Sequence, residues 1–143
     1  MNKYDKIKLE NQLCFPIYAL SREIIKSYKP FLDKFDFTYT QYITMLVMWE
    51  DEKITFKNLG KKLHLDSGTL TPVVKKLESK GLVIKYRTKE DDRVVVIELT
   101  EKGRLLKNDI VEVPEKMSCN SVISESQASE LKEKLNKILK QFE

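Results

Sequence analysis

The chain has 143 residues, of which 41% are hydrophobic and 34% charged, with only four glycines and four prolines. This composition is typical of one globular, helix-rich domain rather than of a disordered chain or an all-β sandwich, and no apolar run approaches the roughly 18–20 residues that span a bilayer. With a net charge of +4, no signal-peptide core, one histidine and two cysteines, we expect a cytoplasmic protein without a membrane partner, a metal site, a cofactor or a disulfide framework.

Residues 9–35 form the first predicted helical segment. Apolar side chains recur there at nearly helical spacing, at Leu9, Leu13, Ile17, Leu20, Ile24 and Tyr28. Pro16 interrupts this pattern, so the helix should begin late or be kinked. A second helix is predicted from Thr40 to Trp49.

The next two predicted helices are short and close together. Thr55 is a plausible N-cap for a helix that directs Phe56, Leu59 and Leu63 inward. After His64-Leu65, either Asp66 or Ser67 caps another helix, which ends at Lys80-Gly81. The segment therefore reads as a helix-turn-helix.

A β-hairpin is predicted directly after it. Residues 82–87 and 94–99 are rich in β-branched side chains, and the polar residues 88–92 between them suit an exposed tip. A helix-turn-helix followed by a hairpin is a winged helix. The expected fold class is thus mainly α with a small β-hairpin wing.

The C-terminal third is predicted to be helical again. Thr100 should cap a helix through Val113 that Pro114 bends or ends, and Ser124 with Gln127 fits a capping box for the last helix. That helix carries an apolar stripe at Leu131, Leu135, Ile138 and Phe142. The stripes at the two chain ends can pair across a two-fold axis in a homodimer, or they can pack against each other within one chain.

The positive charge is concentrated in the middle of the chain. Residues 53–89 hold ten cations against Asp66 and Glu78, a net charge of +8, whereas the remainder is −4. Such a segment is typical of a protein that binds a polyanion, although a solvated charged face gives the same count.

In a winged helix, the second helix of the motif enters the major groove of double-stranded DNA. We therefore expect Ser67, Thr69 and Thr71 near bases or phosphates, with Gly68 allowing close backbone approach. Ser67 alone would also read as a helix cap. Lys75 and Lys76 lie further along this helix, facing phosphates or solvent.

Several motifs together resemble one branch of a known family. They are residues 9–15 (LENQLCF) with Tyr18, residues 39–42 (YTQY), Trp49-Glu50, residues 65–72 (LDSGTLTP) and residues 91–93 (DDR). These segments are similar to MarR-family winged-helix regulators of the OhrR type, which sense organic peroxides. The resemblance implies one MarR-type domain over residues 1–143, a homodimer joined by residues 9–35 and 101–143, a DNA-binding module over residues 53–99, and repression of nearby genes.

The resemblance also assigns a role to the wing. Asp91 and Arg93 match the family's Asp-x-Arg motif, in which the acid orients an arginine that enters the minor groove. The alternative for Arg93 is a surface salt bridge. Arg87 and Lys89 are expected to touch the DNA backbone, and a dimer implies a pseudo-palindromic operator.

Cys14 is the candidate redox sensor, although a cysteine in an apolar stripe is often an inert hydrophobe. Tyr18 lies four residues later on the same helix face. In the family pattern Tyr28 supplies a second phenol, across the dimer. Phenol donors and a helix N-terminus stabilise a thiolate, which a peroxide oxidises to a sulfenic acid.

Cys119 is the candidate second thiol, in a polar connection between the last two helices. Some family members have a resolving cysteine near this position, so the resemblance implies an intersubunit Cys14–Cys119 disulfide that releases the repressor from DNA. Cys119 as a chance surface thiol is the alternative.

Three other functions stay open. A MarR-type repressor could instead bind an aromatic or phenolic ligand near Phe15, Tyr39 and Tyr42, and a thiol peroxidase could use Cys14. We expect no enzyme, because His64 lies in the turn of the DNA module and reads as a surface residue. A non-DNA adaptor fits poorly with the +8 segment.

Overall fold

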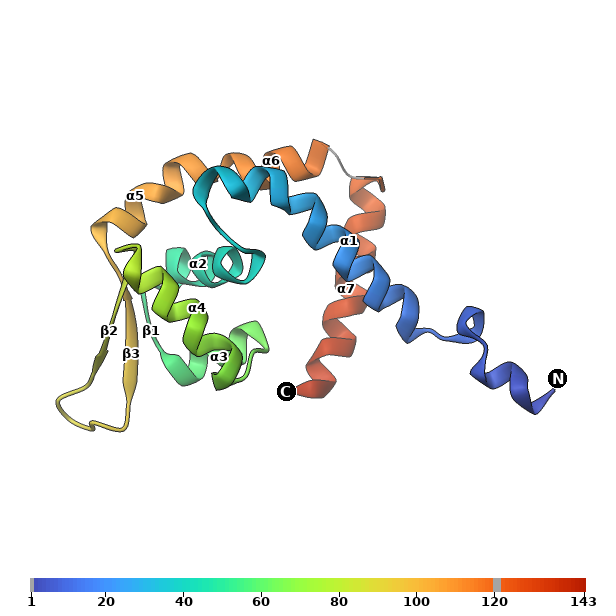
Figure 1. The fold of residues 1–143 in the computed structure, drawn as a ribbon, viewed down its shortest axis with the longest axis horizontal. Helices are drawn as coiled ribbons and strands as arrows, with labels where there is room; N and C mark the ends of the chain where they lie inside the picture. The colour runs from blue at the N-terminus through green and yellow to red at the C-terminus, as the bar shows by residue number, and fades with distance from the viewer. Residues whose placement is uncertain (1, 120–121) are drawn as a thin grey trace. The chain divides into compact units, whose positions relative to one another are not determined.

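The structure is a computed structural model that describes residues 2–119 and 122–143 (Figure 1). It comprises two compact units, residues 1–39 and residues 40–143, and each is considered by itself below. In the described residues, no helix is long and apolar enough to cross a membrane.

One long helix dominates the first unit. This helix is α1 (Cys14–Leu32). The 3-10 turns η1 (Lys3–Ile7) and η2 (Leu9–Asn11) precede it, and η3 (Asp33–Phe35) follows it. The helix predicted from Leu9 therefore begins later, at Cys14. Pro16 explains this start, because its ring would clash with the carbonyl of residue 12 if the helix extended upstream, while in the first turn its missing N–H costs nothing.

The first unit ends in a tight reversal. Asp36 adopts the left-handed conformation, with φ of 55°, and the Phe37 N–H donates to the Leu32 carbonyl at 3.2 Å. This is the hydrogen-bond pattern that closes many helix C-termini. It reverses the chain, so that Tyr39 lies beside Tyr28 of α1.

The second unit has the predicted winged helix-turn-helix. Its elements are α2 (Tyr39–Asp51), β1 (Lys53–Thr55), α3 (Phe56–Leu63), α4 (Ser67–Ser79), β2 (Val83–Arg87) and β3 (Val95–Leu99). The hairpin strands are antiparallel, with Val83 opposite Leu99 and Arg87 opposite Val95. The two predicted strands are thus confirmed to within one residue at each start.

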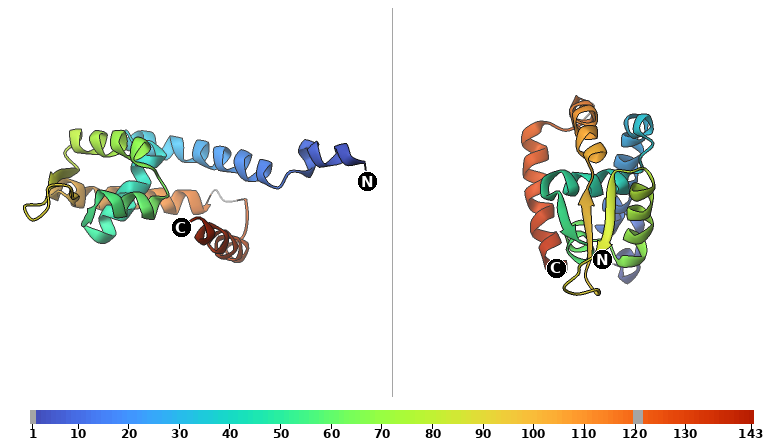
Figure 2. Two further views of the ribbon diagram at one scale, coloured as in Figure 1. Left: turned by 90° about the horizontal axis from the view of Figure 1, so that it is seen from below. Right: turned by 90° about the vertical axis from the view of Figure 1, so that its left-hand side faces the viewer.

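The sheet contains a short strand that the sequence analysis missed. Strand β1 pairs with β3, which gives the order β1-β3-β2 seen side by side in Figure 2. Glu52 enables the step from α2 into β1, because its φ of 57° reverses the chain and its carbonyl accepts the Leu99 N–H at 2.7 Å. The sheet therefore fixes the wing to the helix-turn-helix through β1 and α3.

The core of this unit is built from the predicted inward faces. Its fully buried side chains include Met45, Met48, Leu59, Leu70, Leu77 and Ile97. They come from α2, α3, α4 and β3, so burial of these faces holds α4 against the sheet.

The C-terminal part corrects two expectations. It contains α5 (Glu101–Ile110), α6 (Glu112–Cys119), α7 (Glu125–Leu139) and η4 (Lys140–Phe142). The break expected at Pro114 occurs earlier, at Val111, and Pro114 lies in the first turn of α6, where proline is tolerated. Cys119 is therefore the last residue of α6 in the backbone, and it does not lie in the connection between the last two helices, where it was predicted. The predicted capping box of Ser124 and Gln127 is confirmed.

Both end helices expose their apolar stripes. Among the described residues, α1 buries only Leu32 and α7 buries none. Each stripe thus presents exposed large apolar side chains, which include Leu13, Ile17, Leu20, Ile24, Leu131, Leu135, Ile138 and Phe142.

Candidate functional site

The recognition helix α4 has one buried and one exposed face. Leu70, Val73, Val74 and Leu77 are buried, whereas the predicted DNA-contacting residues are exposed. The exposed set is Ser67, Gly68, Thr69, Thr71, Lys75 and Lys76. The structure therefore places all six of these predicted residues on the solvent side of one helix.

The N-cap of α4 decides between Asp66 and Ser67, the two residues that the sequence offered for this role. Asp66, not Ser67, is the N-cap, and its Oδ1 accepts the Thr69 N–H at 2.7 Å. Hydrogen bonds from the Thr69 backbone and side chain lower the pKa of Asp66. The capping reading of Ser67 is thus wrong, and this serine begins the exposed face.

Not every hydroxyl on this face is free to donate to DNA. The Thr71 Oγ1 donates to the Ser67 carbonyl at 2.7 Å, and the Thr69 side chain is bound to Asp66. Both threonines therefore offer a methyl group and an acceptor oxygen to an incoming ligand. Gly68 has room for a Cβ, since Asp66 Oδ1 would lie 3.4 Å away.

The cations of residues 53–89 do not form one uniform patch. Lys53 Nζ lies 3.8 Å from Glu98 Oε1, and Lys62 Nζ lies 2.7 Å from Asp51 Oδ2. These acids come from outside the segment, so they neutralise part of its +8 charge. Among the described residues, sequence reasoning left three exposed cations of this segment unassigned that have no such pairing. One is Lys85 on β2, and the others are Lys57 and Lys61, one turn apart on α3. Their four-residue spacing was the available signal.

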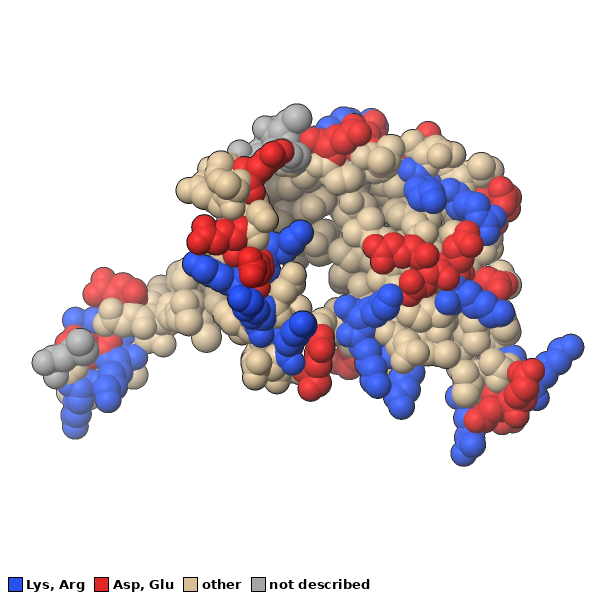
Figure 3. Space-filling model, turned by 180° about the vertical axis from the view of Figure 1, so that it is seen from behind, with Lys and Arg blue, Asp and Glu red and all other residues tan. Residues whose placement is uncertain are grey.

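The wing carries the second group of cations. In Figure 3, Lys and Arg side chains project from the edge of this unit at α3 and at the tip of the wing. The exposed basic residues of the hairpin are Lys85, Arg87, Lys89 and Arg93. Arg87 also has a structural bond, because its Nη1 donates to the Asp92 carbonyl at 2.7 Å and ties the tip to β2.

Asp91 holds Arg93 in the geometry that the motif predicts. Its Oδ1 accepts the Arg93 backbone N–H at 3.0 Å and Nε at 3.1 Å, and its Oδ2 accepts Nη2 at 3.3 Å. These hydrogen bonds, the side-chain one foremost, lower the pKa of Asp91. The Arg93 side chain is nevertheless 87% exposed, so the pair orients the guanidinium outward.

The candidate thiol lies at the start of α1. Cys14 is exposed and is the first residue of the helix, and Leu13 provides no side-chain cap. The unpaired N–H groups and the positive end of the helix dipole favour an anion at this position. Tyr18 follows one turn later, as predicted, and its hydroxyl accepts a hydrogen bond from Arg22 Nη1 at 3.2 Å.

Tyr28 is paired with a phenol that sequence reasoning had not placed with it. The Tyr28 and Tyr39 rings lie 5.0 Å apart between centroids, at 52°. Desolvation by burial raises the pKa of both phenols, so each keeps its proton as a hydrogen-bond donor. Tyr28 cannot reach Cys14 of its own chain, because fourteen residues of α1 separate them by about 21 Å.

The prediction for the Cys119 side chain lies outside the described residues, although the backbone of Cys119 ends α6.

The burial of Tyr42 bears on the alternative site for an aromatic or phenolic ligand. Tyr42 is only 4% exposed and belongs to the core of the second unit. A cleft of 1210 Å³ in that unit is lined instead by α3, the start of α4 and the C-terminal end, with Phe56, His64, Leu70 and Phe142 among its residues.

The sequence and structure match a known group of regulators. Residues 26–110 match the family described as transcriptional regulator SarA/Rot. The organic hydroperoxide resistance transcriptional regulator of Bacillus subtilis (strain 168) is 55% identical over 113 residues, which cover 79% of this chain and 77% of the relative.

Structures of AbfR, a protein of Staphylococcus epidermidis, also match. Reduced AbfR bound to DNA has a TM-score of 0.80 at 33% identity over 99% of both chains. Overoxidised AbfR bound to DNA has a TM-score of 0.80 at 34% identity over 99% of this chain and 100% of that chain. Disulfide-formed AbfR has a TM-score of 0.67 at 33% identity over 96% of both chains. The chain therefore belongs to the SarA/Rot family of MarR-like winged-helix transcriptional regulators.

Proposed function

We propose that this chain is a homodimeric, cytoplasmic repressor that leaves a pseudo-palindromic operator when an organic peroxide oxidises Cys14. The observation that carries the proposal is the exposed Cys14 at an uncapped helix N-terminus, one turn from Tyr18, in a chain that also has an exposed recognition helix and wing. Its 55% identity to a regulator of organic hydroperoxide resistance supports the same stimulus.

DNA contact is assigned to three elements of the second unit. The exposed face of α4 enters the major groove, Arg93 on the wing enters the minor groove, and Lys57 and Lys61 on α3 contact phosphates. Lys75, Lys76, Arg87 and Lys89 add further backbone contacts. The DNA complexes of AbfR support this arrangement, since their chain has the same fold over its whole length.

The exposed apolar stripes support a homodimer. Leu131, Leu135 and Ile138 of α7, with Ile17 and Ile24 of α1, would be costly to leave in water. A second copy of the chain is the partner that carries matching stripes. In a dimer, Tyr28 and Tyr39 of one subunit would act on Cys14 of the other, because the reach along α1 excludes Cys14 of the same chain.

The proposed oxidation has two steps. The Cys14 thiolate attacks the terminal oxygen of ROOH, the O–O bond breaks, and the products are Cys14 sulfenic acid and an alkoxide that takes a proton to leave as ROH. The Cys119 thiol of the partner subunit then displaces the sulfenic hydroxyl as water, which forms the disulfide. Tyr18, and Tyr28 with Tyr39 of the partner subunit, hydrogen-bond the sulfur during the first step.

The disulfide, rather than oxidation of Cys14 alone, is assigned as the release step. Among the AbfR structures, the reduced and overoxidised forms are bound to DNA, and both match this chain with a TM-score of 0.80. The disulfide form matches less well, with a TM-score of 0.67 at 33% identity, the identity of the reduced form. A lower match at equal identity supports a change of conformation on disulfide formation.

The experiment compares wild type with Cys14→Ser and Cys119→Ser, using operator DNA selected from a random pool by the reduced protein. One equivalent of cumene hydroperoxide should give a covalent dimer on a non-reducing gel and DNA release in wild type alone. Cys119→Ser should be oxidised at Cys14 and stay bound. Release from oxidised Cys119→Ser would contradict the disulfide step, and release from Cys14→Ser would contradict the sensor assignment.

Two controls separate the other functions. A thiol peroxidase would consume many equivalents of peroxide with a reductant present, whereas a sensor consumes one for each oxidation. A regulator of the ligand-binding type would leave the operator on addition of salicylate, without a covalent dimer. The buried position of Tyr42 counts against that second function.

A further inference from the structure

The first helix carries a column of three polar side chains on one exposed face. Cys14, Tyr18 and Arg22 follow one another at four-residue spacing, so each lies one turn beyond the last. Arg22 Nη1 lies 3.2 Å from the Tyr18 hydroxyl, and its guanidinium carbon lies 5.6 Å from the centroid of the Tyr18 ring. The guanidinium thus contacts both the oxygen and the face of this ring.

The polarity of this hydrogen bond determines what Tyr18 can do. An arginine only donates, so the phenol oxygen accepts, and the single phenolic hydrogen is left to donate elsewhere. Side chains of a helix lean toward its N-terminus, so Arg22 leans over Tyr18 and Tyr18 leans toward Cys14. The hydrogen that Tyr18 keeps is therefore available to a group one turn nearer the N-terminus, where Cys14 lies.

Among the cations of α1, Arg22 is the one that contacts a phenol instead of an acid. The neighbouring lysines are paired with acids, Lys26 with Glu23 at 3.5 Å and Lys29 with Asp33 at 3.1 Å. Arg22 is instead bound to a neutral phenol, which leaves its charge uncompensated by that contact. A positive charge on the phenol makes it a stronger donor and favours an anion one turn away.

We propose that Arg22 is a positioning residue for the oxidation of Cys14, acting through Tyr18. The inference rests on the proposed function, because it concerns the step in which the Cys14 thiolate attacks the terminal oxygen of the peroxide. Arg22 fixes the Tyr18 hydroxyl as a donor to the sulfur and increases the thiolate fraction at neutral pH. It contacts neither the peroxide nor the sulfur.

The test measures the second-order rate constant for Cys14 oxidation by cumene hydroperoxide as a function of pH. Arg22→Gln should lower the rate about tenfold at neutral pH, as expected for the loss of a charge-assisted hydrogen bond. The deficit should shrink as the pH rises, because the thiol then ionises without assistance. Arg22→Lys, which keeps the charge, should recover part of the rate.

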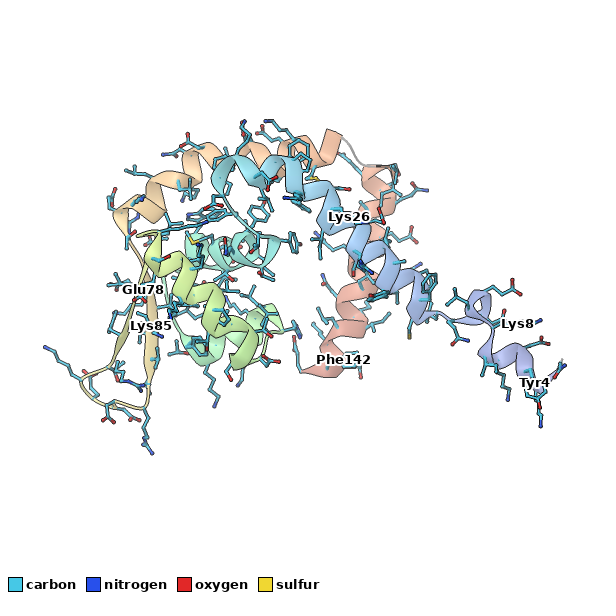
Figure 4. All side chains as sticks on the ribbon, in the orientation of Figure 1. Tyr4, Lys8, Lys26, Glu78, Lys85 and Phe142 are labelled. Atoms are coloured by element: carbon cyan, nitrogen blue, oxygen red, sulfur yellow. The ribbon has the colours of Figure 1, made fainter. Side chains whose placement is uncertain are left out.

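The matched control is Lys26→Gln, one turn further along α1 (Figure 4). It removes the same charge from the same helix, but its side chain is paired with Glu23, so the rate should stay near that of wild type. A double-mutant cycle completes the test: in a Tyr18→Phe background, Arg22→Gln should have little further effect, because Arg22 acts through the missing hydroxyl. Reduced variants should bind the operator like wild type, which confirms their fold.

Three outcomes would overturn the proposal. They are a wild-type rate in Arg22→Gln, a deficit that does not change with pH, and a full effect of Arg22→Gln in the Tyr18→Phe background. Failure of the proposed function is distinguishable, because wild-type Cys14 itself would then not react with the peroxide.

Discussion

At the residue scale, the wing depends on one ion pair. Arg93 is exposed while Asp91 binds its backbone and guanidinium, so the pair would orient the arginine for the proposed contact with the minor groove. We expect Arg93→Ala to weaken operator binding by about tenfold to a hundredfold. Arg93→Lys should have an affinity between those of wild type and Arg93→Ala, since lysine keeps the charge but lacks the planar guanidinium. Fluorescence anisotropy at several salt concentrations measures this. Lys89→Ala is the control. It should weaken binding less than Arg93→Ala does, and it should make the dependence of the affinity on salt concentration less steep than in wild type.

The lowered pKa of Asp91 sets the sign of the pH dependence of this contact. A carboxylate with a depressed pKa keeps its contact above the ordinary value of about 4 and loses it as the pH falls through the lower folded value. The Arg93 contact is therefore intact throughout the neutral range. Asp91→Asn should weaken operator binding at neutral pH, and wild-type affinity in that variant would show that the acid does not orient Arg93.

Residues that share a helix face could be predicted from spacing, and contacts across a turn could not. The Cys14–Tyr18 step and the exposed face of α4 follow from the period of 3.6 residues. The Tyr28–Tyr39 pair depends on the left-handed Asp36, which reverses the chain between the two tyrosines. The pairing of Lys62 with Asp51 likewise requires the fold, since no local pattern joins residues eleven positions apart.

At the element scale, strong local signals gave correct elements and weak ones did not. Thr55, Asp66, Thr100 and Ser124 all cap helices where the sequence suggested a start. Strand β1 has only three residues, and it exists because β3 offers it a partner, so local composition could not reveal it. The prediction that Pro114 bends or ends a helix is wrong in its position, because a proline is equally compatible with the first turn of the next helix.

The junction between β3 and α5 leads to a prediction about one glycine. A Cβ at Gly103 would lie 2.3 Å from the Leu82 carbonyl oxygen and 2.7 Å from Leu99 Cδ1, and the Gly103 carbonyl accepts Trp49 Nε1 at 2.8 Å. Gly103→Ala must therefore displace backbone, and we expect it to lower the free energy of unfolding by about 2–4 kcal/mol. Urea unfolding followed by fluorescence measures this, because Trp49 is the only tryptophan of the sequence.

Gly68 provides the matched control for Gly103. A Cβ there makes one ordinary contact, with Asp66 Oδ1 at 3.4 Å, and the residue lies in helix α4. Gly68→Ala should keep or raise the free energy of unfolding, by up to about 1 kcal/mol, because alanine is the better helix former. Equal destabilisation by both substitutions would show that crowding at Gly103 is not the cause.

At the scale of the whole molecule, the two exposed apolar stripes are the features that point to a second copy of the chain. Both were predicted from periodicity, and both are exposed in the described residues. Their exposure within each unit is the physical reason for proposing a second copy as their partner, and in that proposal the second copy also supplies the Tyr28–Tyr39 pair to Cys14 of the first chain.

The dimer can be tested through Leu135, which lies in the middle of the α7 stripe and is 45% exposed. Leu135→Lys places a charge in the proposed apolar interface, so the variant should sediment as a monomer at concentrations where wild type is a dimer. Operator binding should weaken at least a hundredfold, because two half-sites are no longer held by one particle. Val122→Lys makes the same chemical change at a side chain that is 98% exposed outside the helices, and it should stay dimeric. If Leu135→Lys sedimented as a dimer with unchanged operator affinity, the interface would have to lie elsewhere, and the assignment of the partner subunit's phenols to Cys14 would lose its basis.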